Sequence, residues 1–152
     1  MGVAGDRVGP YRLVRELGRG GMGEVWLAEH VDIKSLVAVK LLRPDPSGQR
    51  DGLERFLREA KATARIRHPG IIQVTDFGAT AAGGAYLVME LLDGESLASR
   101  LARGRLPVDT AIELRLQIAD ALAPAHRQGI IHRDLKPANV FLVRDLATRG
   151  GA

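Results

Sequence analysis

A glycine-rich stretch between two strand patterns limits the folds open to this chain of 152 residues. The stretch GRGGMG sets Gly18, Gly20 and Gly23 in the spacing G-x-G-x-x-G, which lets a backbone approach phosphate oxygens closely. The preceding YRLVREL and the following EVWLAE both read as strands, so the glycines join a hairpin. A dinucleotide site needs a helix after its glycines and a Walker loop needs G-K-[ST], and the sequence has neither here. A plain hairpin turn remains an equally good interpretation of the glycines alone.

The rest of the chain mixes strand and helix patterns. In YRLVREL, Tyr11, Leu13, Arg15 and Leu17 are predicted to share one face. Further strands are predicted over 35–42, 71–77 and 85–91, and a short one over 139–143. Helices are predicted over 52–67, 93–104 and 106–129. Pro124 lies inside the last helix, where a proline typically costs ~3 kcal/mol, and we expect it to tilt the approach to the segment that follows.

Composition excludes several classes of protein. The chain has no cysteine, so it has no disulfide framework and no thiolate metal site. Its apolar runs are shorter than the roughly 18 residues of a membrane span, and a cytoplasmic location is expected. The net charge of +4 comes from scattered residues and aromatic residues are only 4%, which makes a nucleic-acid surface the weakest of the functional hypotheses.

Two charged residues follow the hairpin at suggestive positions. The sequence VAVK places Ala38 and Lys40 on one face of a strand, where a small side chain could lie beside a flat base and an ammonium beside phosphates. Glu59 lies in the predicted helix 52–67 and could pair with Lys40. The alternatives are a solvated lysine at a strand end and a surface glutamate paired with Arg55 or Lys61.

The most specific motif is HRDLKPAN, residues 132–139. Asp134 can accept a proton, Lys136 can hold a phosphoryl group, and Asn139 can coordinate a metal ion. A loop of this composition is not expected by chance, and it indicates a functional site.

Together, and in this order, these motifs resemble the N-terminal part of a bacterial-type serine/threonine protein kinase, over residues 11 to about 143. The resemblance implies an α+β, protein-kinase-like fold. A leader (1–10) would precede a small lobe and hinge (11–92) with a five-stranded antiparallel sheet plus one helix. An incomplete, mainly helical large lobe would occupy 93–152.

The resemblance also implies a reaction and its residues. ATP and Mg²⁺ would be the cofactors, and the γ-phosphoryl group would pass to Ser or Thr of a protein substrate. In ATP binding, the phosphates would lie under Gly18, Gly20 and Gly23, and the adenine would lie against Leu17, Val25 and Ala38. Lys40 would hold the α- and β-phosphates and pair with Glu59. At the hinge, the implied residues are Met89 as gatekeeper and the backbones of Glu90 and Leu92. Asp134 would accept the hydroxyl proton, Lys136 would support the phosphate, and Asn139 would bind magnesium.

An Asp-Phe-Gly triplet occurs at residues 76–78, before the catalytic motif, whereas the magnesium triplet of the family comes after it. We therefore interpret Asp76 as a strand residue of the small lobe. No second triplet follows Val143, which predicts a chain truncated before that motif and weakly active or inactive. The alternative is a non-catalytic nucleotide-binding or regulatory module, similar to a pseudokinase. Self-association is expected through an apolar stripe on the predicted helix 106–129, formed by Ala111, Leu114, Ile118, Leu122 and Ala125.

Overall fold

The computed structural model describes residues 2–20, 23–42, 60–61, 64–80 and 83–144. The chain divides into two compact units. The first, the sheet unit, comprises residues 1–65 and 72–91, and the second, the helical unit, comprises residues 66–71 and 92–152. Each unit is described by itself below.

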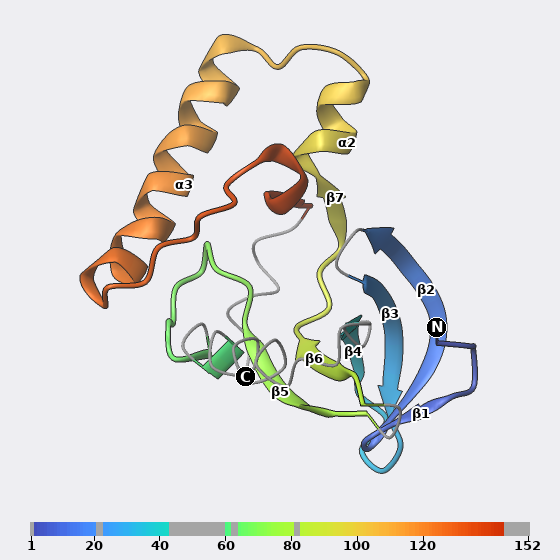
Figure 1. Ribbon diagram of the computed structural model, residues 1–152. Helices are drawn as coiled ribbons and strands as arrows, with labels where there is room; N and C mark the ends of the chain where they lie inside the picture. The colour runs from blue at the N-terminus through green and yellow to red at the C-terminus, as the bar shows by residue number, and fades with distance from the viewer. Residues whose placement is uncertain (1, 21–22, 43–59, 62–63, 81–82, 145–152) are drawn as a thin grey trace. The chain divides into compact units, whose positions relative to one another are not determined.

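The sheet unit is built on one antiparallel sheet of six strands, in the order β1-β2-β3-β4-β6-β5 (Figure 1). Adjacent strands in the chain mostly pair as hairpins, which is typical of antiparallel sheets. The strands are β1 (Arg7–Val8), β2 (Tyr11–Gly20), β3 (Gly23–His30), β4 (Leu36–Leu42), β5 (Val74–Ala79) and β6 (Ala85–Met89).

The core of this unit lies on one face of the sheet. Because side chains alternate along a strand, Trp26 and Ala28 of β3 point to the same side, where both are buried. The whole core cluster comprises Tyr11, Leu13, Trp26, Ala28, Val39, Tyr86 and Val88. The Tyr11 hydroxyl of β2 donates to Asp76 Oδ2 of the edge strand β5 at 3.1 Å. That bond joins strands far apart in the sheet order, so the sheet is curled rather than flat.

Three details of the sheet unit differ from the sequence-based expectations. Residues 7–8, assigned to a leader, form β1 and pair with β2, which makes a sixth strand. Register shifts between Leu13 and Arg15 and between Glu16 and Gly18 break the alternation in β2. Leu17 is therefore 40% exposed and does not join the core face with Leu13. Most of the expected helix 52–67 lies outside the described residues, although Ala60 and Ala64 are helical.

The helical unit contains a second, two-stranded sheet beside two helices. Its elements are β7 (Gly94–Ser96), α2 (Leu97–Ala102), α3 (Val108–Arg127), the 3-10 turn η1 (Pro137–Asn139) and β8 (Phe141–Val143). Strand β7 pairs antiparallel with β8. The side chain of Ser96 accepts from the backbone N–H of Ser99, and this cap starts α2 at Leu97. The helix expected from residue 93 is thus shorter, because residues 94–96 are a strand.

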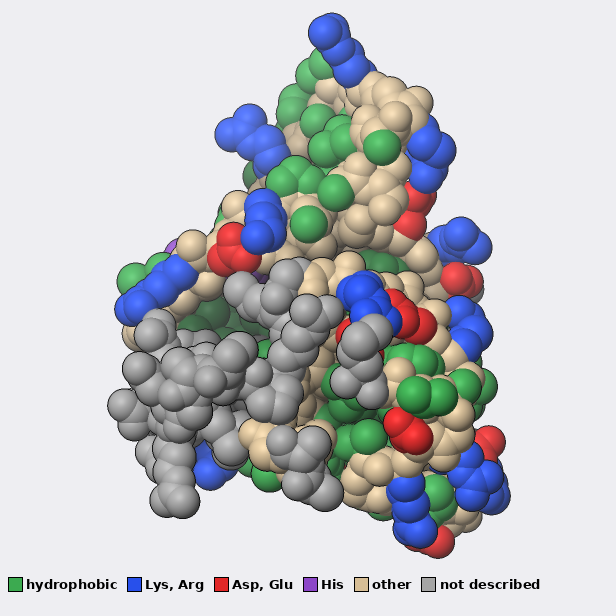
Figure 2. Space-filling model, turned by 45° about the vertical axis from the view of Figure 1, so that its right-hand side comes forward, with side chains coloured by type: hydrophobic (Ala, Val, Ile, Leu, Met, Phe, Trp, Pro, Cys, Tyr) green, Lys and Arg blue, Asp and Glu red, His purple; other side chains and the backbone are tan. Residues whose placement is uncertain are grey.

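Helix α3 runs through Pro124 without a break. His68 contacts this helix, because its Nε2 lies 3.1 Å from Asp120 Oδ2, while its Nδ1 accepts from the N–H of Gly70 at 2.9 Å. Among the described residues, no helix is both long enough and apolar enough to cross a membrane. An apolar groove lies between α2 and α3, and Figure 2 shows hydrophobic side chains gathered where these helices lie, in the upper part of the view. Its lining includes Leu97, Leu101, Leu106, Ala111, Leu114 and Ile118.

Candidate active site

The glycine-rich stretch joins β2 to β3, and its three motif glycines differ in what surrounds them. Gly18 pairs with Val25 and Gly20 pairs with Gly23 across the hairpin. At Gly23 the backbone φ is +145°, and an added Cβ would lie 2.0 Å from the carbonyl oxygen of Leu41. The fold itself therefore requires glycine at position 23. An added Cβ at Gly18 or Gly20 would meet no atom of the described residues within 4 Å, so these residues leave the space above both glycines open.

Four of the predicted ATP-binding side chains share one face of the sheet. Val25 lies directly opposite Lys40, and Ala38 lies directly opposite Met89. Directly opposed residues point to the same side, and Ala38 is two residues from Lys40, so all four project together. This is the face opposite the core of Trp26 and Val39.

Lys40 carries the positive charge of this face. Its side chain is largely buried, and burial lowers the pKa of its ammonium group below the ordinary value. Within the described part of the chain no carboxylate pairs with it, and the predicted partner Glu59 lies outside that part. A partly desolvated ammonium without a partner is suited to an anionic ligand.

The predicted hinge residues follow β6. The backbone N–H of Glu90 donates to the carbonyl of Gln73 at 3.1 Å, and the Glu90 carboxylate accepts from the N–H of Gln73 at 2.8 Å. These two bonds fix Glu90 against the chain entering β5. Leu92 is half-buried and begins the second part of the helical unit.

The helical unit brings Asp134, Lys136 and Asn139 together. Lys136 Nζ lies 2.8 Å from Asp134 Oδ2. Asn139 Nδ2 donates to the same oxygen at 3.1 Å and to the Asp134 carbonyl at 2.8 Å. The side chains of Asp134 and Lys136 are about half exposed, so a substrate can reach them.

Electrostatics keep Asp134 ionised. The hydrogen bond from Lys136 lowers the pKa of its carboxyl group most, and the bond from Asn139 lowers it further. Arg133, just before it, has a φ of +61°, a left-handed conformation that is uncommon outside glycine. Such strained backbone is often found where a loop must aim a functional side chain.

The two-stranded sheet holds this loop in place. Asn139 ends η1, its N–H donates to the Lys136 carbonyl at 2.9 Å, and the chain passes into β8. The carbonyl of Val140 accepts from the N–H of Leu97 at 2.7 Å, which ties the loop to the start of α2.

Comparison with known proteins decides the family. The model of the protein kinase domain matches residues 11–148, nearly the whole chain. This chain belongs to the protein kinase domain family.

Its relatives include bacterial serine/threonine kinases. Serine/threonine-protein kinase pkn2 of Myxococcus xanthus is 46% identical over 134 residues, which cover 88% of this chain and 16% of pkn2. Serine/threonine-protein kinase PknA of Mycobacterium tuberculosis is 45% identical over 139 residues, covering 88% of this chain and 32% of PknA. The chain thus spans less than a third of the length of these two curated relatives.

Solved structures support the same fold. The PknI kinase domain of M. tuberculosis superposes with a TM-score of 0.85 at 34% identity, covering 95% of this chain and 59% of that one. The α+β, kinase-like fold expected from the sequence is confirmed.

Within this kinase fold, the triplet at residues 76–78 is part of the sheet. Asp76 lies in β5, where its Oδ2 accepts from Tyr11 at 3.1 Å and its Oδ1 accepts from the N–H of Phe77 at 2.8 Å. An added Cβ at Gly78 would lie 2.7 Å from the Tyr86 ring. The hydrogen bonds of Asp76 and the close packing at Gly78 therefore account for both residues within the sheet. This agrees with the prediction, made from the order of the motifs, that Asp76 is a strand residue.

The magnesium site implied by the kinase family is supplied only in part. The described residues contain no cluster of three or more His, Cys, Asp or Glu able to hold a metal ion. Since the Nδ2 of Asn139 faces two oxygens of Asp134, its Oδ1 is left for another partner. Magnesium commonly takes one or two protein oxygens together with phosphates and waters, so Asn139 fits as a single ligand.

Sequence reasoning missed Arg19 and Glu24, which lie within and just after the glycine-rich stretch. Glu24 is only 2% exposed and forms an ion pair with Arg19. A signal was present in EVWLAE, because period-two alternation puts Glu24 on the same face as Trp26 and Ala28. A carboxylate on an otherwise apolar strand face predicts a buried polar cluster.

Proposed function

We propose that this chain binds ATP and provides the catalytic loop for transfer of the γ-phosphoryl group to Ser or Thr side chains of proteins. The observation that carries the proposal is the cluster of Asp134 with Lys136 at 2.8 Å and Asn139 at 3.1 Å. The ionised, accessible Asp134 would orient the substrate hydroxyl and accept its proton. Lys136 would offset the negative charge of the transferred group, in a reaction where catalysis is mainly positioning and charge stabilisation.

The second support is the face of the sheet that carries Lys40. The open space above Gly18 and Gly20 suits close approach of phosphate oxygens to the backbone. Lys40 would bind the α- and β-phosphates, with Glu59 as its proposed partner. The adenine would lie against Leu17, Val25, Ala38 and Met89, with the backbones of Glu90 and Leu92 as hydrogen-bonding partners.

Magnesium would be held through the Oδ1 of Asn139, and when bound it supplies charge compensation to the phosphates. The sequence after Asn139 contains no second Asp-Phe-Gly triplet. In this chain the family resemblance therefore assigns one magnesium ligand, and we expect phosphoryl transfer by these 152 residues alone to be weak.

The proposed organisation keeps residues 11–92 as the small lobe and hinge and residues 93–152 as part of the large lobe. Residues 1–10, expected to be a leader, are better regarded as part of the small lobe, because Arg7–Val8 form β1.

Binding of a non-hydrolysable ATP analogue tests the nucleotide assignment. Lys40→Met should weaken binding at least about tenfold in calorimetry, since a charged partner of the phosphates is lost. Lys34→Met is the matched control, because Lys34 is an exposed lysine of the same unit whose ammonium pairs with Glu29 among the described residues. Equal affinity in Lys40→Met and the parent would contradict the assignment.

Phosphoryl transfer to a Ser/Thr-rich acceptor protein separates the enzyme from the regulatory alternative. The parent should show slow transfer, and Asp134→Asn should abolish it while nucleotide affinity stays within about twofold. A parent that binds nucleotide but transfers no more than Asp134→Asn is instead a non-catalytic module.

A further inference from the structure

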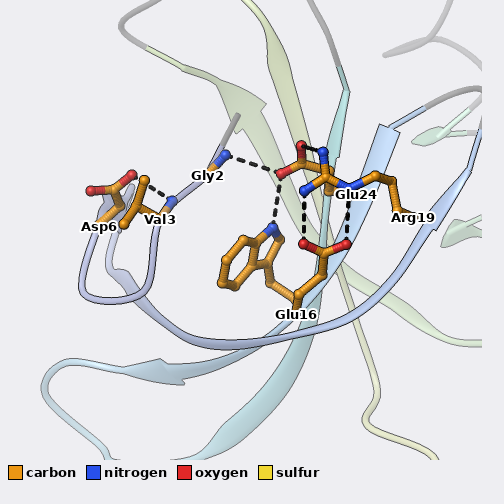
Figure 3. Close-up of polar contacts among 7 residues, drawn as sticks. Gly2, Val3, Asp6, Glu16, Arg19 and Glu24 are labelled. Carbon is orange, nitrogen blue, oxygen red and sulfur yellow. Dashed lines mark hydrogen bonds and ion pairs between the residues drawn. The ribbon is translucent and has the colours of Figure 1, made fainter.

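Arg19 lies between Gly18 and Gly20, yet its side chain is held on the opposite side of the hairpin from the open space above them. It pairs directly with Glu24 across β2 and β3, and Glu24 lies on the core face with Trp26. Two carboxylates hold the guanidinium (Figure 3). Glu16 accepts from Nε at 3.0 Å and from Nη2 at 2.8 Å, and Glu24 Oε1 lies 3.1 Å from Nη1.

Glu24 is the buried end of this cluster. Its Oε2 accepts from the N–H of Gly2 at 3.0 Å and from the indole N–H of Trp26 at 3.1 Å. Its Oε1 accepts no hydrogen bond from the described residues, and its contact with Arg19 is an ion pair without hydrogen-bond alignment. Burial raises the pKa of Glu24, but the bonds from Gly2 and Trp26 and the charge of Arg19 together bring it below its ordinary value. Glu24 is therefore a buried anion.

The N-terminal segment closes over this anion. An added Cβ at Gly2 would lie 2.8 Å from the Leu13 side chain and 2.9 Å from that of Leu41, so the segment is seated against the core. The N–H of Gly5 donates to the Leu13 carbonyl at 2.8 Å, and the Asp6 carbonyl accepts from the N–H of Leu13 at 2.9 Å. These contacts fix the position of Glu24, and through it the position of Arg19.

Stability alone does not account for such a cluster. Only the Glu24 end of the cluster is buried, because the side chain of Arg19 is 38% exposed and that of Glu16 is 33% exposed. Taking the Glu24 carboxylate out of water costs free energy that its polar contacts must first offset, so the pair is a weak source of stability. The attested use of such an ion pair is to fix one arrangement among several. Here the arrangement fixed is the pairing of residues 18–20 with residues 23–25, where glycine at positions 18, 20 and 23 gives the backbone more conformational freedom than other residues would.

We infer that Arg19 is a positioning residue, which Glu16 and Glu24 hold on the core face so that the backbone around Gly18 and Gly20 is set for the phosphates of a nucleotide. The inference rests on the proposed ATP binding. The inference differs from general damage to the site because it predicts an effect on phosphate binding and none on nucleoside binding. Weakening the cluster should reduce affinity for a triphosphate without reducing affinity for a nucleoside.

The experiment compares a non-hydrolysable ATP analogue with adenosine, by calorimetry on the full chain at a temperature where every variant is folded. Arg19→Met keeps the apolar stem and removes the guanidinium, and Glu24→Gln keeps the shape and removes the charge. Each should lower affinity for the analogue about tenfold and change affinity for adenosine by less than about twofold. Arg19→Lys keeps the positive charge but loses the planar guanidinium that binds a carboxylate through two N–H groups. Its affinity for the analogue should lie between those of the parent and Arg19→Met.

Glu29→Gln is the matched control. It is the same substitution in the same strand, at a residue whose ion pair with Lys34, at 3.5 Å, lies at the surface. It should leave both affinities unchanged.

Three results would overturn the inference. Equal losses for adenosine and the analogue would show general damage to the unit, and losses no larger than that of Glu29→Gln would show that the cluster is irrelevant to phosphates. A loss in Arg19→Met without one in Glu24→Gln would mean that Arg19 contacts the phosphates itself. A parent that binds neither ligand overturns the proposed function, whereas a parent that binds the analogue with unaffected variants overturns only this inference.

Discussion

At Gly23 a side chain has no room, whereas at Gly18 and Gly20 it would enter open space. The same motif therefore combines two physical demands. Position 23 requires glycine because a side chain would collide with the carbonyl of Leu41. Positions 18 and 20 would require glycine so that a ligand can approach the backbone. A substitution series can separate stability from binding at neighbouring positions.

Gly23→Ala should lower the free energy of unfolding by ~1–3 kcal/mol or more, because the φ of +145° is strained for alanine and the new methyl meets Leu41. Gly83→Ala is the control, since Gly83 also has a positive φ, of +80°, but nothing within 4 Å. Gly18→Ala and Gly20→Ala should change stability by less than about 1 kcal/mol and yet weaken binding of an ATP analogue. Urea unfolding and calorimetry measure the two effects. A Gly23→Ala chain no less stable than Gly83→Ala would rule out the steric argument.

Tyr11 gives the sheet unit a predictable response to alkali. Burial first, and then the charge and hydrogen bond of Asp76, raise the pKa of its hydroxyl to about 12 from an ordinary 10.0. Folding thus favours the neutral phenol. The stabilisation is complete below pH 10 and is lost as the pH rises toward 12.

Tyr11→Phe should cost about 1 kcal/mol at neutral pH, because one hydrogen bond to a partly buried carboxylate is lost. It should also reduce the decline in stability between pH 10 and 12, although Tyr86, whose pKa is raised mainly by burial, will contribute its own share. Urea unfolding across that pH range is the measurement. A decline as steep in Tyr11→Phe as in the parent would show that other groups cause it.

Segments that carry a local motif could be predicted from the sequence. Features that depend on pairing between strands could not. The motif HRDLKPAN predicts Asp134, Lys136 and Asn139 as site residues, and the structure brings their side chains together because they lie within eight consecutive residues. Their roles in catalysis stay a prediction. Strand β1 was missed because two residues carry no periodicity, and its existence depends on pairing with β2. The prediction that Leu17 shares a face with Leu13 was wrong, because bulges in β2 shift the alternation of its side chains between the two faces of the sheet. A bulge has no reliable sequence signal.

The loop at residues 132–139, proposed to be the catalytic loop, is held by the pairing of β7 with β8. Gly94 has a φ of +157°, and an added Cβ would lie 2.0 Å from the carbonyl oxygen of Leu142. Gly94→Ala should separate the two strands and release the segment that follows Asn139.

Hydrogen exchange should show this release as faster exchange over residues 139–143, with β2–β4 unchanged. Gly104→Ala is the matched control, because Gly104 also has a positive φ, of +128°, but open space around it. Similar exchange over 139–143 in both variants would mean that β7 does not hold the loop.

Across the whole molecule, apolar burial is unequally distributed. The sheet unit has a core cluster of seven buried residues. In the helical unit, α2 buries no residue, and α3 buries Ala121 and Ala125. Exposed apolar side chains on α3 include Val108 at 73%, Ile112 at 49% and Leu116 at 65%.

We expect amide exchange to be slower in residues 11–20, 23–42 and 74–89 than in residues 94–143, since protection follows buried apolar contacts. Uniform protection in a monomeric chain would contradict this expectation.

Self-association should accompany that exposure, through the apolar groove between α2 and α3. Leu101→Glu should shift sedimentation toward monomer, because Leu101 lines the groove and is 39% exposed, so a charge would enter its apolar surface. Leu36→Glu, at an apolar residue of β4 that is 52% exposed, is the control in the sheet unit. Sedimentation that both variants alter equally would exclude the α2–α3 groove as the contact.

Trp26 is the chain's one tryptophan, and it lies 6% exposed with its indole N–H bonded to the Glu24 carboxylate. Its fluorescence therefore arises from a single place, beside a fixed negative charge and beneath the N-terminal segment. Emission should change when Gly2 leaves Glu24, even while the rest of the sheet stays folded. The protein thus contains its own optical probe of how the hairpin is held, and no label is needed to follow that event in real time.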